Sequence, residues 1–224
     1  SIFINPAQFN EENDFTNYPK TFEADLDILE KTNCEIIFTP SVKEMYPRGA
    51  NPEKTVLKYR DILCDLSRPG HFDGVTTIVK ILLDLIKPSR VFFGEKDYQQ
   101  LKIIEQLILQ NSLNIDLIKC PSVRDLNGMS LSSRYVNFSQ NQQLQFEECA
   151  KIINTQFKIL KKIFNQETVQ SIEYELKNFG ISKIDYCEVR NEENLSLSKI
   201  NERSRLFIAF YLSKIRVIDN FILY

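Results

Sequence analysis

Four short apolar runs in the first half of the chain predict the strands of a buried parallel sheet. They occupy residues 2–4, 35–38, 90–93 and 115–119. Runs of this length that do not alternate with polar residues are typical of strands covered on both faces.

Helical periodicity fills the intervals between these runs. Apolar residues recur at every third or fourth position in residues 22–31, 75–86 and 97–110. This spacing places them on one face of a helix, where a sheet can bury them. The alternation of strand and helix predicts an α/β fold with a doubly wound, Rossmann-like parallel sheet.

The pattern changes after about residue 122. Two amphipathic segments predict helices at 141–165 and 167–179, and Gly180 is a natural stop for the second. Three runs rich in β-branched and aromatic residues follow at 184–190, 205–212 and 215–221. Strands so close in sequence favour an antiparallel sheet. We therefore predict a Rossmann-like domain over 1–121 and a smaller C-terminal α+β domain over 122–224.

Composition and charge are those of an ordinary globular protein of 224 residues. Hydrophobic residues make up 43% and charged residues 26% of the chain, and the net charge is −2. The charges are spread along the sequence, which does not favour a nucleic-acid partner. The longest apolar stretch, residues 81–86, contains Asp84 and is far too short to cross a bilayer. We therefore expect no membrane partner either.

Five widely spaced cysteines and one histidine restrict the metal and redox chemistry. No C-x-x-C pair occurs, and His71 is the sole histidine, which argues against a structural zinc site. Scattered thiols are typical of reducing compartments, so we predict a cytoplasmic location. We interpret all five cysteines as small core residues.

The turn after the third apolar run is the strongest candidate for chemistry. Ligands of open α/β sheets bind beyond the carboxyl ends of the strands, where Gly94, Glu95, Lys96 and Asp97 lie. A glycine lets the backbone approach a ligand, the start of the next helix favours phosphate, and Lys96 adds a mobile positive charge. A plain turn with Asp97 capping the helix is the competing interpretation.

Two further segments carry candidate groups. Ser132 and Ser133 stand beside Arg134, a combination that suits phosphate oxygens but also fits a serine-rich loop before a helix. His71 lies at a predicted junction of loop and helix, and no Ser/His/Asp spacing supports a catalytic triad. We interpret this histidine as a structural residue.

Six segments together resemble the pantothenate synthetase family. They read SIFINPAQF (1–9), YPKT (18–21), SRPGHFDGV (67–75), FFGEKDYQQL (92–101), PSVR (121–124) and LSSR (131–134). Their order and spacing match the family, and Arg216, Asp219 and Asn220 resemble its last strand. The resemblance implies a nucleotidyltransferase fold related to class I aminoacyl-tRNA synthetases.

The resemblance also implies an activity. Such an enzyme joins pantoate to β-alanine through a pantoyl adenylate, consuming ATP and releasing AMP and pyrophosphate. It uses Mg²⁺ and is typically a homodimer.

Site residues are implied by the same motifs. Lys96 is expected to stabilise charge on the α-phosphate, and Ser132, Ser133 and Arg134 to close over the triphosphate. The implied ATP-binding positions are Gly94, Lys96, Asp97, Val123, Leu131, Ser132 and Arg134. Gln8 and Gln100 match the pair that holds pantoate, whose gem-dimethyl group would lie against Val75, Ile78 and Val79. The core face of a helix is the alternative role for those three, and Asp25 is the candidate metal ligand, although Ala24 stands where a second carboxylate is expected.

Two departures from the family pattern limit these expectations. The family's upstream Pro-Thr-Met-Gly and His-x-Gly-His segments, whose histidines contact the ATP phosphates, do not occur in the sequence. Tyr135 replaces an asparagine. We therefore expect the 224 residues to be part of a longer enzyme, and we expect this chain to be a poor catalyst on its own. The alternatives are an inactive homologue that only binds ligand or dimerises, and another adenylyl-transferring enzyme of the superfamily.

Overall fold

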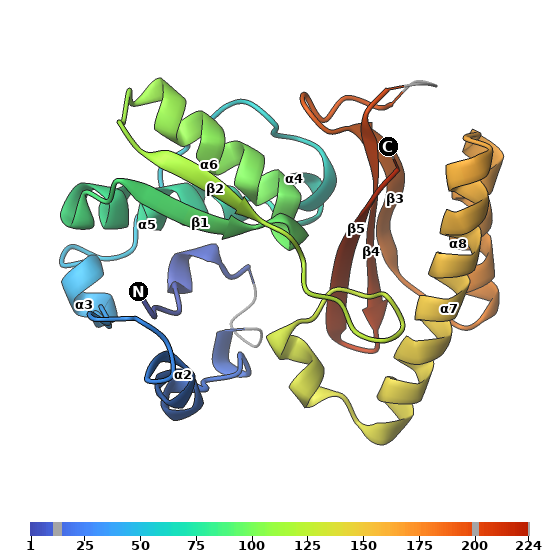
Figure 1. Ribbon diagram of the computed structural model, residues 1–224, viewed down its shortest axis with the longest axis horizontal. Helices are drawn as coiled ribbons and strands as arrows, with labels where there is room; N and C mark the ends of the chain where they lie inside the picture. The colour runs from blue at the N-terminus through green and yellow to red at the C-terminus, as the bar shows by residue number, and fades with distance from the viewer. Residues whose placement is uncertain (11–14, 199–201, 224) are drawn as a thin grey trace.

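A two-stranded parallel sheet organises the first part of the chain. The computed structural model describes residues 1–10, 15–198 and 202–223. Strand β1 (Arg90–Gly94) pairs with β2 (Asp116–Cys120), and Phe92 lies opposite Ile118. The helical elements of this part are η1 (Pro6–Gln8), α2 (Phe22–Leu29), α3 (Val42–Met45), α4 (Leu63–Ser67), α5 (His71–Ile86), η2 (Glu95–Asp97) and α6 (Tyr98–Gln110) (Figure 1).

Helices α5 and α6 bury one face of this sheet. Phe72 and Val75 of α5 pack with Ile104 of α6, and the inward residues Val91 and Phe93 of β1 join the same cluster. The opposite face is more open, with 66% of Phe92 and 38% of Ile118 exposed. The prediction that these strands are covered on both faces is therefore wrong for the described residues.

Residues 2–4 and 35–38 do not form the two further strands that the sequence suggests. One backbone hydrogen bond of 2.9 Å, from Ile2 to Phe38, joins the two segments, and a strand needs a continuing ladder of such bonds. Ile36 is 84% exposed, whereas Phe3 and Phe38 pack near the buried Met45. The prediction of burial is therefore correct for Phe3 and Phe38 and wrong for Ile36.

A three-stranded antiparallel sheet organises the second part of the chain. Its order is β3–β4–β5, with β3 (Ile184–Asn191), β4 (Ser204–Leu212) and β5 (Ile215–Ile222). Before it come η3 (Ser133–Asn137), α7 (Gln140–Lys162) and α8 (Gln166–Asn178). In Figure 1 the sheet has helices α7 and α8 on one side and the first part of the chain on the other. This confirms the α/β class with a C-terminal antiparallel sheet.

Each face of the antiparallel sheet has its own apolar cluster. Ile153 of α7 and Ile172 of α8 pack with Leu206 and Phe210 on one face. On the other, Phe207 packs with Tyr98 at the start of α6. The central strand β4 is thus buried between helices α7 and α8 on one face and the first part of the chain on the other.

The expected stop at Gly180 is confirmed. Its φ is +108°, a value that favours glycine, and its N–H donates to the carbonyl of Lys177 at 3.0 Å. The N–H of Ile181 donates to Leu176 at 2.9 Å, which completes the pairing that ends many helices. Local sequence alone therefore specifies the end of α8.

All five cysteines are free thiols. Cys149 and Cys187 are buried as expected, but Cys34 is exposed and Cys64 and Cys120 are half-buried. Assigning all five to the core was wrong, because Cys34 lies in a loop and Cys64 and Cys120 lie on partly exposed positions of α4 and β2. Over the described parts of the chain, no helix has both the length and the apolar character that a membrane span requires.

Candidate active site

Two adjoining hollows lie where the two parts of the chain meet. The larger has a volume of about 820 Å³ and the smaller of about 340 Å³. They share the lining residues Tyr18, Arg68, Lys96, Asp97, Ser132 and Arg134. The turn after β1 and the loop before η3 therefore face the same space, although more than thirty residues separate them in sequence.

The smaller hollow collects most of the site residues that the sequence suggests. Besides the shared residues, it is lined by Gln8, Gln100, Leu131 and Ser133. The two candidate glutamines come from η1 and α6, so tertiary folding brings them to one place. Gly94 and Val123 do not line either hollow, and Val123 is 69% exposed.

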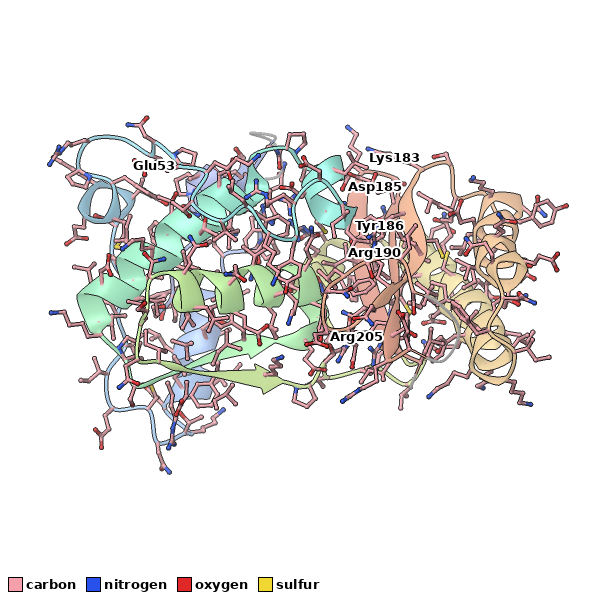
Figure 2. The ribbon with its side chains drawn as sticks, turned by 90° about the horizontal axis from the view of Figure 1, so that it is seen from above. Glu53, Lys183, Asp185, Tyr186, Arg190 and Arg205 are labelled. Carbon is pink, nitrogen blue, oxygen red and sulfur yellow. The ribbon has the colours of Figure 1, made fainter. Side chains whose placement is uncertain are left out.

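The larger hollow extends along the antiparallel sheet and is strongly basic. Lys183, Lys214 and Arg216 line it together with Arg68, Lys96 and Arg134. Asp97 is the one acidic side chain among the described residues that line either hollow. Figure 2 shows Lys183, Asp185 and Tyr186 following one another along the antiparallel sheet. Such a surplus of positive charge favours a polyanionic ligand.

Arg216 joins the two parts of the chain beside this hollow. Its Nε donates to Asp185 at 2.7 Å, and its Nη2 donates to the hydroxyl of Ser67 at 3.1 Å. Ser67 immediately precedes Arg68, which lines both hollows. Arg216 thus links the wall formed by the antiparallel sheet to the wall formed by α4 and α5.

The position of Gln8 depends on a close approach between η1 and α5. A Cβ atom at Gly74 would lie 2.1 Å from the carbonyl oxygen of Ala7, so only glycine fits there. Asn5 donates to the carbonyl oxygen of Gly74 at 3.1 Å and to the side-chain oxygen of Gln8 at 3.3 Å. The hydroxyl of Tyr46 donates to Asn5 at 2.7 Å. This packing fixes Gln8 at the smaller hollow.

His71 holds the backbone of the same glutamine. Its Nδ1 lies 2.7 Å from the carbonyl oxygen of Gln8, and its Nε2 lies 3.2 Å from Nη1 of Arg68. Because a guanidinium can only donate, Nε2 accepts and Nδ1 carries the proton. Burial, and then the charge of Arg68, lower the pKa of His71 to about 3. A neutral, structural histidine agrees with the interpretation from the sequence.

The loop that carries Arg134 is held from both sides. The hydroxyl of Ser132 accepts from the N–H of Arg134 at 3.3 Å, and the Arg134 guanidinium lies 5.4 Å from the ring centre of Tyr18. Tyr135 points away from the hollows and packs on Phe138 and Phe146, with ring centres 5.0 and 4.6 Å apart. Tyr135 therefore anchors the loop on the apolar cluster and does not line either hollow.

The turn at Lys96 is not a simple capped turn. Asp97 occupies the cap position of α6 but makes no side-chain hydrogen bond there. Both Lys96 and Asp97 line the two hollows. The geometry therefore favours a ligand-binding role over the competing capping role.

Four other candidates lie away from the hollows. Val75 and Ile78 are 2% and 4% exposed and belong to apolar clusters around α5, and Val79 packs against the same clusters. Asp25 of α2 accepts from the hydroxyl of Thr21 at 3.3 Å. In the part of the chain that the structure describes, no three His, Cys, Asp or Glu side chains gather as a metal site. Asp25 therefore belongs to no such cluster among the described residues.

Several lining residues had no assigned role at the sequence level. Tyr18, Arg68 and Arg216 fall in recognised motifs, which is a signal that could have identified them. Lys183 and Lys214 lie in no recognised motif. A lysine beside a strand or in a hairpin is usually solvated, so its local sequence does not indicate a site. The two lysines reach the larger hollow only because the antiparallel sheet packs against the first part of the chain, which the sequence does not show.

Comparisons with known proteins agree with this geometry. The model of the pantoate-beta-alanine ligase family matches residues 1–222. A pantothenate synthetase from Caldicellulosiruptor bescii is 36% identical over 99% of this chain and 80% of its own length. One from Acinetobacter baylyi is 39% identical over 98% and 79%.

Solved structures show the same fold. The pantothenate synthetase of Thermus thermophilus superposes with a TM-score of 0.88 at 30% identity, covering 100% of this chain and 82% of that one. The pantoate-beta-alanine ligase of Francisella tularensis, solved with beta-gamma ATP and beta-alanine, gives 0.83 at 34% identity, covering 99% and 77%. The chain belongs to the pantoate–β-alanine ligase family.

Proposed function

We propose that the two hollows form the site at which this enzyme makes pantothenate from pantoate, β-alanine and ATP. One observation carries the assignment to this site. Lys96, the Ser132–Arg134 loop and the pair Gln8 and Gln100 all line one basic space. These are the residues for which the family motifs imply contacts with phosphate and with pantoate.

The reaction has two steps. A carboxylate oxygen of pantoate attacks the α-phosphorus of ATP, and the bond to the bridging oxygen breaks, so pyrophosphate leaves with the electron pair. The amine of β-alanine then attacks the acyl carbon and loses a proton, and AMP leaves. Both steps need positioning and stabilisation of phosphate charge more than acid–base groups.

The lining residues suit these demands. Lys96 supplies a point charge to the α-phosphate, while Arg134 with the hydroxyls of Ser132 and Ser133 contacts the triphosphate. Gln8 and Gln100 offer amide donors and acceptors for the hydroxyl and carboxylate of pantoate. Asp97 and Leu131 complete the adenosine side, with Asp97 accepting from ribose hydroxyls. Gly94 and Val123 line neither hollow, so their contact with adenosine is kept only as a proposal.

The contact of Val75, Ile78 and Val79 with the gem-dimethyl group is retained only as a proposal. It would require ligand binding to open the apolar packing around α5. Mg²⁺ would arrive with the phosphates, because this ion usually keeps several waters and is bound through one or two carboxylates together with substrate phosphates. Asp25 is the candidate carboxylate, and no step is assigned to the ion.

We further propose a cytoplasmic homodimer with two domains that divide near Pro121. The free thiols support a reducing compartment. The separate apolar clusters of the two sheets support the domain division. The measured mass in solution tests the dimer.

Binding measurements test the assignment of the site. Titration of the chain with pantoate, and separately with ATP, should give saturable binding. Gln8→Ala should lower the affinity for pantoate and leave that for ATP unchanged. Arg134→Ala should lower the affinity for ATP and leave that for pantoate unchanged. Binding that neither substitution changes would contradict the proposed site.

A further inference from the structure

A buried asparagine of β5 holds the turn that carries Lys96. The side-chain amide of Asn220 donates to the carbonyl oxygen of Glu95 at 2.8 Å and to that of Lys96 at 3.0 Å. Asn220 is 2% exposed. The clamp therefore comes from the antiparallel sheet, whereas the turn itself follows β1 of the parallel sheet.

The orientation of this amide is determined by Arg205. Nη1 of Arg205 donates to the side-chain oxygen of Asn220 at 2.8 Å. Because a guanidinium has no acceptor, the amide oxygen must face Arg205 and the NH₂ group must face the two carbonyls. The hydrogen-bond pattern thus leaves one arrangement of the amide.

Arg205 is itself held in place on three sides. It is 4% exposed, its Nε donates to Glu192 at 2.7 Å, and its Nη2 donates to Glu95 at 3.1 Å. Its guanidinium lies 4.1 Å from the ring centre of Tyr98. A fully paired buried network of this kind is rigid and costly to disturb.

The neighbouring residue, Asp219, holds the other phosphate-facing segment. Its side chain accepts from the N–H of Ser130 at 2.8 Å and from Arg124 at 3.0 Å. Ser130 lies two residues before Ser132. Two adjacent residues of one strand therefore fix the backbone leading to Lys96 and the backbone leading to Ser132.

We propose that Asn220 is a positioning residue that holds Lys96 in place for the nucleotide through the Glu95–Lys96 backbone. The proposal rests on the function proposed above for Lys96. Without the clamp, the two carbonyls would lose the donors that Asn220 supplies, and the lysine would be displaced. A displacement of about 1 Å can cost on the order of 100-fold in rate.

A double-mutant cycle between Asn220→Ala and Lys96→Ala tests this role. The readout is pantoate-dependent release of pyrophosphate from ATP. Asn220→Ala should lower kcat by on the order of tenfold and change the KM for ATP by less than about threefold. In the Lys96→Ala background it should have no further effect. Effects that multiply would overturn the proposal, because independent sites add in free energy.

Two further variants separate positioning from lost stability. Asn165→Ala is a control for the loss of two hydrogen bonds, because the side-chain oxygen of this exposed asparagine accepts twice from Thr168, away from both hollows. It should keep the wild-type kcat, and an equal loss in both variants would refute a positioning role. Asn220→Asp keeps the acceptor for Arg205 but removes both donors, so normal activity in that variant would also overturn the proposal.

Amide hydrogen exchange tests the clamp without any turnover. Asn220→Ala should speed exchange in residues 94–98 by on the order of tenfold, whereas Asn165→Ala should not. Unchanged exchange would overturn the clamp itself. Faster exchange together with no pantoate-dependent release of pyrophosphate by the wild type would leave the clamp standing and would refute adenylation by these residues on their own.

Discussion

His71 donates from Nδ1 to the carbonyl oxygen of Gln8 across a distance of 2.7 Å. The bond joins the first turn of α5 to η1, and Arg68 holds the other ring nitrogen. A second proton on this ring would place two positive groups together in a buried position. The backbone of the residue proposed to bind pantoate is therefore held by a histidine that must stay neutral.

Stability should fall at mildly acidic pH because of this histidine. Its pKa is lowered to about 3 in the folded protein from the ordinary value of 6.5, first by burial and then by Arg68. The unfolded chain therefore binds the extra proton between pH 6.5 and 3 while the folded chain does not. The free energy of unfolding is then constant above about pH 6.5 and decreases as the pH falls below it.

Urea unfolding at pH 7.5 and pH 5 measures this effect. The wild type should lose up to about 2 kcal/mol more than His71→Asn, which cannot titrate. Equal losses in the two proteins would show that His71 is not held neutral.

Gly74→Ala should impair pantoate binding even though alanine is the better helix former. The new Cβ would overlap the backbone of Ala7 and Gln8, which cannot move as easily as a side chain. We expect a net destabilisation of about 1–3 kcal/mol and weaker pantoate binding with little change for ATP. Calorimetric titration checks both ligands. Unchanged pantoate affinity would show that the contact with Gly74 does not position Gln8.

Gln100→Ala should mainly affect the use of pantoate. The substitution leaves a polar group of the substrate without its partner, which costs about 1–3 kcal/mol, or roughly 5- to 150-fold in affinity. The dissociation constant for pantoate should rise while that for ATP stays constant. Gln110→Ala is the control, because it removes a glutamine of the same helix that lies outside both hollows. An unchanged dependence on pantoate would refute the assignment of Gln100.

Tyr135→Phe should leave activity intact and should not destabilise the protein. The hydroxyl of Tyr135 is buried without a hydrogen-bond partner, so removing it relieves a desolvation cost. Tyr135→Ala, in contrast, should cost about 3–5 kcal/mol by removing the ring that packs on Phe138 and Phe146. Thermal unfolding of both variants separates the two effects. A loss of turnover in Tyr135→Phe would show that the hydroxyl reaches the ligand.

The C-terminal half of the fold could be predicted well because its signals are local. Gly180 ends α8 through its own backbone angle, and the three strands lie close together in sequence. The prediction of strands at residues 2–4 and 35–38 was wrong, because an apolar run indicates burial but does not show that a neighbouring strand is available for pairing.

The site could be predicted only where its residues lie in motifs. Lys96, Gln8 and Arg134 were identified in this way, and the structure places all three at one hollow. The basic wall with Lys183 and Lys214 was missed, because it forms only when the antiparallel sheet folds against α4 and α5. The contact between Asn220 and the turn at Lys96 was also missed. It forms between the two parts of the chain, and its partners are backbone carbonyls, which no residue type indicates.

Pyrophosphate release is the measurement that tests the central claim most directly. The chain is incubated with ATP and Mg²⁺, with and without pantoate, and compared with Lys96→Ala. We predict release that depends on pantoate, however slow, and that falls by on the order of 10²–10³ in Lys96→Ala. Release that ignores pantoate, or that Lys96→Ala leaves at the wild-type rate, would contradict the assignment of this basic hollow as the site of adenylation.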